Sequence, residues 1–170
     1  GGSSSGGSGG SGGGGSSSSG SGSSKGPGNT VTGSRGDAAH GGSGAWEKDE
    51  RGWRYKYADG AIEIGHVSAE TNQEQVAWQH INGNWWAFGS DGYLKNGWVL
   101  DQSSNKWYWN DENTGMQKGW QFINNKWYYF STVENSLDAR PYGSMYQNEK
   151  TPDGYFVTAD GSWDGNSPAL

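Results

Sequence analysis

Residues 97–130 read GWVLDQSSNKWYWNDENTGMQKGWQFINNKWYYF, and one pattern occurs in them twice. A Gly-Trp pair, at Gly97-Trp98 and again at Gly119-Trp120, is followed by a polar turn. An aromatic run comes next, Trp107-Tyr108-Trp109 in one unit and Trp127-Tyr128-Tyr129-Phe130 in the other. Short aromatic segments bounded by Asn, Asp and Gly are typical of β-hairpins, and no apolar stripe of helical period persists. We therefore predict a β-hairpin in each unit.

The spacing continues toward the N-terminus, because Trp98 lies 22 residues before Trp120 and Trp78 lies 20 residues before Trp98. A second Trp series runs in step with this one. Repeats of this period indicate stacked units, and a hairpin too small to be stable alone gains stability from its neighbours. The prediction is an all-β solenoid of stacked hairpins. Its repeats are expected at about 45–76, 77–96, 97–118 and 119–146, with a C-terminal cap hairpin over 147–165.

The N-terminal segment has a different composition. Residues 1–24 are exclusively Gly and Ser, and residues 1–44 contain no aromatic side chain. Such a segment has nothing to bury and behaves as a flexible coil. We predict a disordered Gly/Ser-rich linker over 1–44 and a folded repeat domain over 45–170. The tripeptide Arg35-Gly36-Asp37 is read as a chance occurrence in that linker.

Charge and composition exclude several classes of protein. The formal net charge is -6. Such an acidic chain is not expected to bind nucleic acid, whose phosphates need Lys and Arg. There is no Cys, which rules out disulfides and Cys-based zinc sites, and no apolar run is long enough to span a membrane. No catalytic motif stands out among the three His residues. We predict no enzyme activity in this chain, no cofactor and no metal.

The alternation of side chains along a strand suggests how the rings are used. Trp107 and Tyr108 point to opposite faces of one strand. Trp107 is expected to meet Trp98 of its own unit, and Tyr128 of the next unit closes the group. Three ring faces around one gap suit a quaternary ammonium, which has no N–H donor and is recognised through cation–π attraction. Rings also stack on sugars, or simply form a core in a chain this poor in aliphatic residues, so a cation site, a saccharide site and a structural stalk all stay open.

A known repeat family is similar to two stretches of this sequence, Asn113 to Trp120 and Gly119 to Phe130. Both stretches are similar to the choline-binding, or cell-wall-binding, repeat of Gram-positive surface proteins and their phages. The resemblance implies a left-handed spiral of β-hairpins that is non-catalytic and carries ligand sites between consecutive repeats. Related repeats in glucan-synthesising enzymes and clostridial toxins bind sugars instead.

The resemblance also implies which side chains bind the ligand. Each site takes the tryptophan of Gly-Trp, the tryptophan of the aromatic run, and an aromatic residue of the next repeat. The residues implied are Trp98, Trp107 and Tyr128 with Met116 as a soft wall; Trp78, Trp85 and Tyr108; Trp46, Trp53 and Trp86; and Trp120 with Trp127, for which Tyr155 is the candidate third ring.

The implied function is attachment to a cell surface. We expect a secreted or phage-encoded module that binds choline-type substituents of wall teichoic or lipoteichoic acid, or another surface glycopolymer. A saccharide-binding module and a structural stalk are the alternatives. The chain is expected to belong to a longer protein, such as a wall hydrolase with its catalytic domain upstream.

Overall fold

The computed structural model of the chain describes residues 36–166. Apart from one 3-10 turn, η2 (Ala38–His40), every element in that range is a β-strand. Residues 1–35 of the linker predicted over 1–44, with Arg35 of the Arg-Gly-Asp tripeptide, lie outside the described residues.

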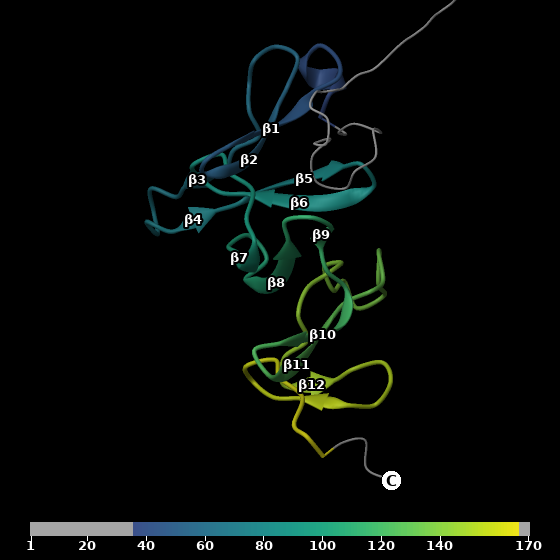
Figure 1. Ribbon diagram of the computed structural model, residues 1–170. Helices are drawn as coiled ribbons and strands as arrows, with labels where there is room; N and C mark the ends of the chain where they lie inside the picture. Colours follow the sequence, from purple (N-terminus) through teal and green to yellow (C-terminus); the bar gives the residue numbers. More distant parts are fainter. Residues whose placement is uncertain (1–35, 167–170) are drawn as a thin grey trace, which may run out of the picture.

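Within residues 36–166, four long antiparallel hairpins follow one another along the length of the molecule (Figure 1). They are formed by β1 (Ala45–Asp49) with β2 (Gly52–Lys56), β5 (Ala77–Ile81) with β6 (Asn84–Phe88), β7 (Gly97–Asp101) with β8 (Lys106–Asp111), and β10 (Gly119–Ile123) with β11 (Lys126–Phe130). Short strands accompany them: β3 (His66–Val67) with β4 (Glu74–Gln75), β9 (Gly115–Met116) beside β8, and β12 (Glu149–Lys150) with β13 (Phe156–Val157). The predicted all-β stack of hairpins is confirmed.

Two of these hairpins close through two-residue turns with positive φ. Asn82 (φ 55°) and Gly83 (φ 85°) join β5 to β6, while Asn124 (φ 51°) and Asn125 (φ 69°) join β10 to β11. Positive φ at both central residues gives the turn whose twist matches the strands, and Asn and Gly tolerate that conformation best. The local sequence therefore sets the register of these hairpins.

The register places two tryptophans on one face of each long hairpin. In the hairpin β10–β11, Trp120 pairs with Tyr129 and Phe122 pairs with Trp127. Direct partners across an antiparallel pair share a face, and so do residues two apart on one strand. Trp120 and Trp127 therefore lie diagonally on the same face. The other long hairpins repeat this arrangement with Trp46 and Trp53, Trp78 and Trp85, and Trp98 and Trp107.

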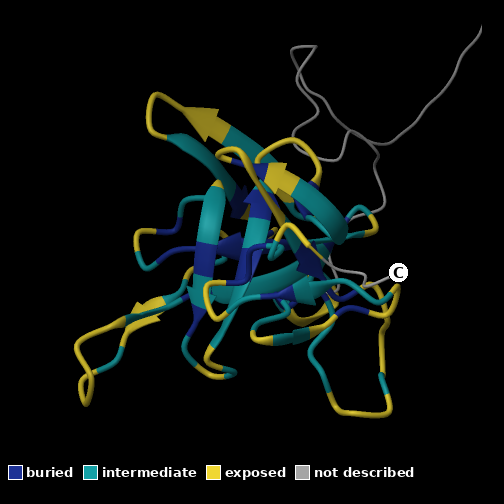
Figure 2. Ribbon diagram, turned by 90° about the horizontal axis from the view of Figure 1, so that it is seen from below, coloured by how far each residue is buried: buried dark blue, intermediate teal, exposed yellow. Residues whose placement is uncertain are grey.

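The core lies between successive hairpins rather than inside any one of them. Figure 2 shows the buried residues along the inner strands and the exposed ones mainly at the turns. One core cluster joins Ala87 of β6 to Val99 and Tyr108 of β7 and β8. Aromatic rings fill much of this interior, since Trp86 and Phe88 are fully buried. Each hairpin is thus stabilised by burial against its neighbours.

The folded part begins earlier than the sequence boundary at residue 44 indicates. The Tyr55 hydroxyl and the Gly44 backbone N–H both donate hydrogen bonds to Asp37 Oδ1, at 2.9 and 3.0 Å. The His40 ring stacks on Tyr57 with centroids 4.1 Å apart. The prediction of disorder is therefore wrong for residues 36–44, because polar contacts at long range hold a segment that has no large apolar side chain to bury.

The segment from Ala61 to Val76 is an insertion between the first and second long hairpins. It contains the small hairpin β3–β4 and packs on the loop after β6. The Gly65 N–H donates to the Gly89 carbonyl at 2.9 Å, and Lys95 Nζ lies 2.7 Å from Glu74 Oε1. The insertion leaves the stack in step, since the hairpins β1–β2 and β5–β6 still share a core cluster.

The C-terminal cap packs on the last long hairpin. β12 pairs with β13, and Val157 forms a further bridge with Trp163. The Trp163 N–H donates to the Trp127 carbonyl at 2.8 Å, and Ser162 bridges to Tyr128. The cap therefore brings its own aromatic side chains against β11.

Candidate functional site

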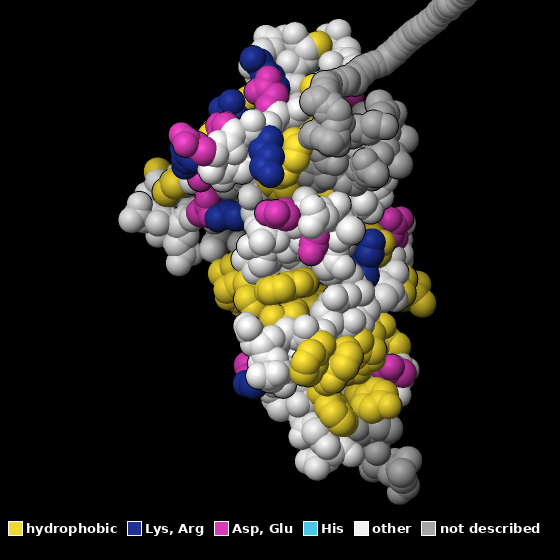
Figure 3. Space-filling model, in the orientation of Figure 1, with side chains coloured by type: hydrophobic (Ala, Val, Ile, Leu, Met, Phe, Trp, Pro, Cys, Tyr) yellow, Lys and Arg dark blue, Asp and Glu magenta, His cyan; other side chains and the backbone are white. Residues whose placement is uncertain are grey.

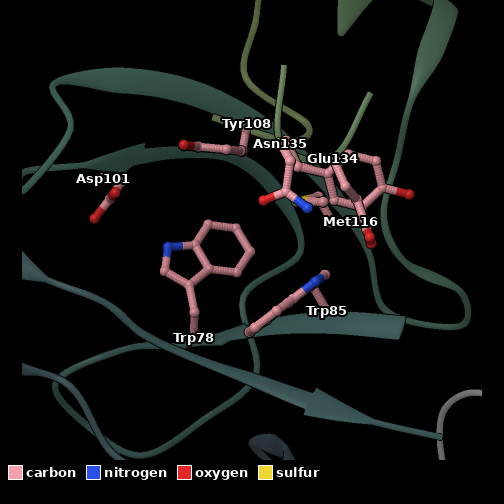
Figure 4. Close-up of a pocket in the computed structure, with 8 residues that line it drawn as sticks. Trp78, Trp85, Asp101, Tyr108, Met116, Glu134 and Asn135 are labelled. Atoms are coloured by element: carbon pink, nitrogen blue, oxygen red, sulfur yellow. The ribbon is translucent and has the colours of Figure 1, made fainter. Parts of the chain in front are cut away.

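The two tryptophan rings of the second hairpin and the Tyr108 ring line a cavity that is open to solvent. Trp78 and Trp85 come from β5 and β6, and Tyr108 comes from β8 of the next hairpin. The Trp78 and Tyr108 centroids are 4.9 Å apart, with the ring planes inclined at 60°. These three rings line a cavity of about 390 Å³ (Figure 4). The sequence-predicted trio Trp78, Trp85 and Tyr108 is thus brought together.

Met116 lines this cavity and not the site to which the resemblance assigned it. The expected neighbours of Met116 were Trp98, Trp107 and Tyr128, but Met116 is buried with Tyr108 and packs near Trp78 and Trp85. The reason is topological, because β9 turns back along β8 and lies close to β6.

The sulfur atom beside the Trp98 group belongs to Met145 instead, which is buried in the cluster against which Trp98, Trp107 and Tyr128 pack. Its backbone N–H donates to the Trp107 carbonyl at 2.8 Å.

A polar edge completes the first cavity, and sequence reasoning missed it. Glu134, Asn135 and Tyr142 come from the loop between β11 and β12, and Asp101 comes from the end of β7. Figure 4 shows the Asn135 amide directed toward the space between Trp78 and Trp85. No local signal marks this loop as part of a site whose two tryptophans lie more than 40 residues earlier in the chain, since only the stacking brings it there.

Asp101 is almost fully buried at this edge and is held by three donors. Gln75 Nε2 lies 2.6 Å from its Oδ1, and the hydroxyls of Ser103 and Ser104 lie 3.1 and 2.8 Å from its carboxylate. Burial raises the pKa of the Tyr108 phenol above its ordinary value, and the charge of Asp101 adds to that rise. Tyr108 therefore stays neutral at physiological pH and presents an intact electron-rich ring.

The rings of the third hairpin meet as predicted but pack more deeply. Trp98 lies 6.2 Å from Trp107 at 89° and 4.9 Å from Tyr128 at 78°. Trp98 also contacts Trp109 edge to face, with centroids 5.0 Å apart. These rings rest on the buried cluster that contains Phe130. The trio Trp98, Trp107 and Tyr128 is therefore brought together, with a large share of core packing.

The last long hairpin forms a second open cavity with the cap. Trp120 lies 6.5 Å from Trp127 at 83° and 5.5 Å from Tyr155 at 86°. Together with Trp163 and Asp153 they line a cavity of about 370 Å³. Tyr155 thus sits where the sequence suggested a third ring, while Trp163 was not anticipated because its approach depends on the cap folding back.

Asp153 places a negative charge at the rim of this second cavity. Its Oδ2 accepts a hydrogen bond from Trp120 Nε1 at 2.9 Å, and its Oδ1 accepts one from the Thr151 hydroxyl. Burial alone would raise the pKa of Asp153, but the hydrogen bonds from Thr151 and Trp120 outweigh it and hold the pKa below its usual value. The carboxylate is therefore ionised at neutral pH.

The first hairpin also gathers its predicted trio. Trp46 lies 6.3 Å from Trp53 at 84° and 5.3 Å from Trp86 at 71°. Trp86 is fully buried, and its Nε1 donates to the Ile81 carbonyl at 2.8 Å. The ammonium of Lys48 lies 5.4 Å from the centroid of the Trp53 ring.

The charges around the two open cavities favour a cation. Asp101 and Glu134 line one cavity and Asp153 lines the other. None of the three appears in the ion pairs found across the described range 36–166. Figure 3 shows hydrophobic side chains gathered over the lower half of the molecule, where Figure 1 places β7 to β12. Electron-rich rings beside uncompensated carboxylates form an environment suited to a desolvated organic cation.

Other kinds of site are not seen in the part of the chain that the structure describes. No group of three or more His, Asp or Glu side chains is arranged to hold a metal ion within residues 36–166. In the same range no helix has the length and hydropathy needed to cross a bilayer.

Two of the hairpins described above match a known protein family. A family model described as a cell wall binding repeat matches residues 76–94 and 118–132, which contain the hairpins β5–β6 and β10–β11. The choline binding domain of Spr1274 from Streptococcus pneumoniae is 32% identical over 51% of this chain and 90% of that domain, with a TM-score of 0.40. This chain belongs to the cell-wall-binding repeat family. The repeats of this family form a binding module and not a catalytic one.

Two further solved structures are similar to the repeat chain. CbpJ from Streptococcus pneumoniae TIGR4 is 26% identical over 69% of this chain and 40% of its own length, with a TM-score of 0.41. The pneumococcal cell wall endolysin of phage Cp-1, solved in complex with choline, is 24% identical over 75% of this chain and 38% of its own, with a TM-score of 0.45. The repeat chain thus spans less than half the length of these two proteins. No curated protein matches it.

Proposed function

We propose that the folded part of this chain attaches its carrier protein to a bacterial surface by holding choline-type head groups in aromatic cages between its hairpins. The cages that carry the proposal are the two open ones, at Trp78, Trp85 and Tyr108 and at Trp120, Trp127 and Tyr155. In each, ring faces from two successive units line a cavity that also carries a carboxylate engaged in none of the ion pairs found within residues 36–166. That single observation, repeated in two places along the stack, is the basis of the proposal.

The chemistry of the ligand follows from what the cages offer. A trimethylammonium group has no N–H to donate, so it cannot be recognised by the hydrogen-bond acceptors that bind an ordinary amine. Aromatic faces attract it through their quadrupole, with about 1–2 kcal/mol per ring in a partly desolvated site. When the free-energy cost of association is subtracted from the attraction of three rings, the remainder corresponds to a dissociation constant of about 1 mM for one head group.

Weak single sites suffice if the ligand is a polymer. Teichoic and lipoteichoic acids that carry many choline substituents would engage several cages of one stack at once. A second head group on the same polymer binds at a high effective concentration, so the overall affinity exceeds that of one cage by about two orders of magnitude or more. We propose such a choline-decorated wall polymer as the partner, with the Trp98, Trp107 and Tyr128 group as a further contact for it.

A saccharide is the second candidate, and a specific feature of the first cavity favours it. Glu134, Asn135 and Asp101 border the rings there, and sugars are bound by such combinations of flat rings with amide and carboxylate groups. The cavity at Trp120 has fewer kinds of polar group in its lining, which are the Asp153 carboxylate and ring N–H or hydroxyl groups. A sugar ligand would therefore prefer the first cavity, whereas a quaternary cation suits both.

The carrier and its location follow from the same proposal. We propose a surface-associated protein of a bacterium or its phage in which the folded part of this chain is the attachment module. A catalytic domain elsewhere in the same protein, such as a wall hydrolase, would act on the surface to which the module binds.

The test is a titration of the full chain with choline chloride, followed by tryptophan fluorescence. We expect a saturable change with a midpoint of about 1 mM, and retention on a choline-substituted resin that free choline reverses. A Trp78→Ala, Trp127→Ala double variant should lose retention, while Leu137→Ala, at a fully exposed loop position, should keep it.

Two outcomes would contradict the choline proposal. A response to a glucan oligosaccharide without one to choline would establish the saccharide function instead. A response to neither ligand, in a chain with native circular dichroism, would leave the stack as a structural stalk.

A further inference from the structure

One position distinguishes the first hairpin from the later ones. In every long hairpin a residue on the first strand stands directly opposite the second tryptophan. The pairs are Lys48 with Trp53, His80 with Trp85, Leu100 with Trp107 and Phe122 with Trp127. Because direct partners share a face of the hairpin, this residue projects from the same face as both cage tryptophans.

In the first hairpin this position holds a lysine. Lys48 Nζ lies 5.4 Å from the centroid of the Trp53 ring, within the range of a cation–π contact. At the same place in the last hairpin, the Phe122 ring lies 5.0 Å from Trp127, and a phenyl ring brings no charge. Leu100 is likewise neutral. The first trio of rings therefore already has an ammonium group on one of its members.

The surroundings of the first trio agree with that difference. Its third ring is Trp86, a bulkier side chain than the Tyr108, Tyr128 and Tyr155 of the later trios, and it is fully buried. Figure 3 shows Lys, Arg, Asp and Glu side chains gathered over the half of the molecule where Figure 1 places β1 to β6, away from the large hydrophobic surface.

We propose that Lys48 acts as a built-in cation that keeps the Trp46, Trp53 and Trp86 trio from binding an external cationic head group. An ammonium over the Trp53 ring uses the attraction that a ligand would need, and it repels a second positive charge brought to the same gap. The residue opposite the second tryptophan is thus a specificity-determining position. The inference rests on the proposed function, since it decides which of the cages bind the head group.

A reciprocal exchange tests the idea. Lys48→Phe gives the first hairpin the residue of the last, and Phe122→Lys does the reverse. Both side chains are exposed in the structure, so neither change should disturb folding. Lys48→Arg serves as a control because it keeps the charge, and Lys48→Met because it removes the charge while keeping a long flexible side chain.

The readout is the NMR signal of each indole N–H during titration with choline chloride at constant ionic strength. In the wild-type chain we expect Trp127 to shift at choline concentrations that leave Trp53 unmoved. Lys48→Phe and Lys48→Met should lower the dissociation constant seen at Trp53 by about tenfold or more, and Lys48→Arg should not. Phe122→Lys should raise the constant seen at Trp127 by about tenfold, with Trp85 unchanged within about twofold.

The two proposals fail in different ways. If choline shifts no indole signal in the wild-type chain, the proposed function is wrong and this inference falls with it. If choline shifts Trp85 and Trp127 but Trp53 responds equally with and without the Lys48 charge, the choline function stands and the role of Lys48 is overturned. An unchanged constant at Trp127 in Phe122→Lys overturns it as well.

Discussion

Replacing Tyr155 by leucine should weaken choline binding at the C-terminal cage by about tenfold. The Tyr155 ring lies 5.5 Å from Trp120, nearly perpendicular to it, and it lines the cavity together with Trp127. One ring of a partly desolvated cage contributes about 1–2 kcal/mol to cation binding, which corresponds to about 5–30-fold in the dissociation constant. Leucine keeps an apolar side chain in the cavity wall, so the loss is mainly that of the electron-rich face.

Tyr155→Phe is the matched control. Phenylalanine keeps the ring face and removes only the hydroxyl, so its dissociation constant should stay within about twofold of that of the wild-type chain. The leucine variant also loses the edge-to-face contacts of Tyr155 with Trp120 and Trp163, worth about 0.5–1.5 kcal/mol each. Urea unfolding of both variants separates that loss of stability from the loss of affinity.

The assay follows the indole N–H signals of Trp120 and Trp127 for this cage, and those of Trp78 and Trp85 for the first cavity. Only the former pair should report weaker binding in Tyr155→Leu. Equal constants for the leucine and phenylalanine variants would refute a cation–π role for this ring. A loss of the same size at both cavities would show that the change acts through the fold and not through the cage.

Two further predictions concern stability. Gly143→Ala should lower the free energy of unfolding by about 2 kcal/mol in a urea titration, because Gly143 has φ 84° and an added Cβ would collide with the Met116 sulfur. The control is Gly60→Ala, which should lower it by about 1 kcal/mol, because Gly60 has φ 92° but open space around it. Equal losses in the two variants would contradict the steric argument. Hydrogen bonds from Ser162 and Thr158 hold the pKa of Asp160 well below its usual range, so the stability that its charge contributes is complete above about pH 4 and declines as the pH falls toward the folded-state pKa. The wild-type chain should therefore have a higher urea midpoint than Asp160→Asn at pH 7, with a smaller difference at pH 2.5, and a difference independent of pH would contradict this linkage.

The hairpins and their paired tryptophans could be predicted because both depend on short-range rules. Asn-Gly and Asn-Asn tolerate positive φ, so they fix two-residue turns, and the turns fix which residues face each other. Once the register is set, the period of two along a strand places Trp78 with Trp85 and Trp120 with Trp127 on one face. The third ring Tyr128 was expected from the alternation of side chains along the strand, and Tyr108 was implied by the resemblance to the repeat family.

The prediction for Met116 was wrong because it depended on how the chain folds back after the third hairpin. The resemblance to the repeat family implied that Met116 lines the site of Trp98, Trp107 and Tyr128. The strand β9 instead folds back beside β8 and brings Met116 to the earlier cavity. Residues 36–44 were assigned to the linker for a related reason, because the bond between Asp37 and Tyr55 joins residues far apart in the sequence and leaves no local pattern.

The sequence by itself determined that this chain forms a stack of aromatic hairpins, since turn geometry and side-chain alternation act over a few residues. Only the tertiary structure decided which further groups finish each cage: Glu134 and Asn135 at the first cavity, Trp163 and Asp153 at the last, and Lys48 on the ring of Trp53. Stacking sets these neighbours, because a hairpin buries its faces against whatever the chain returns to it, and the lengths and folding of the intervening loops control that return.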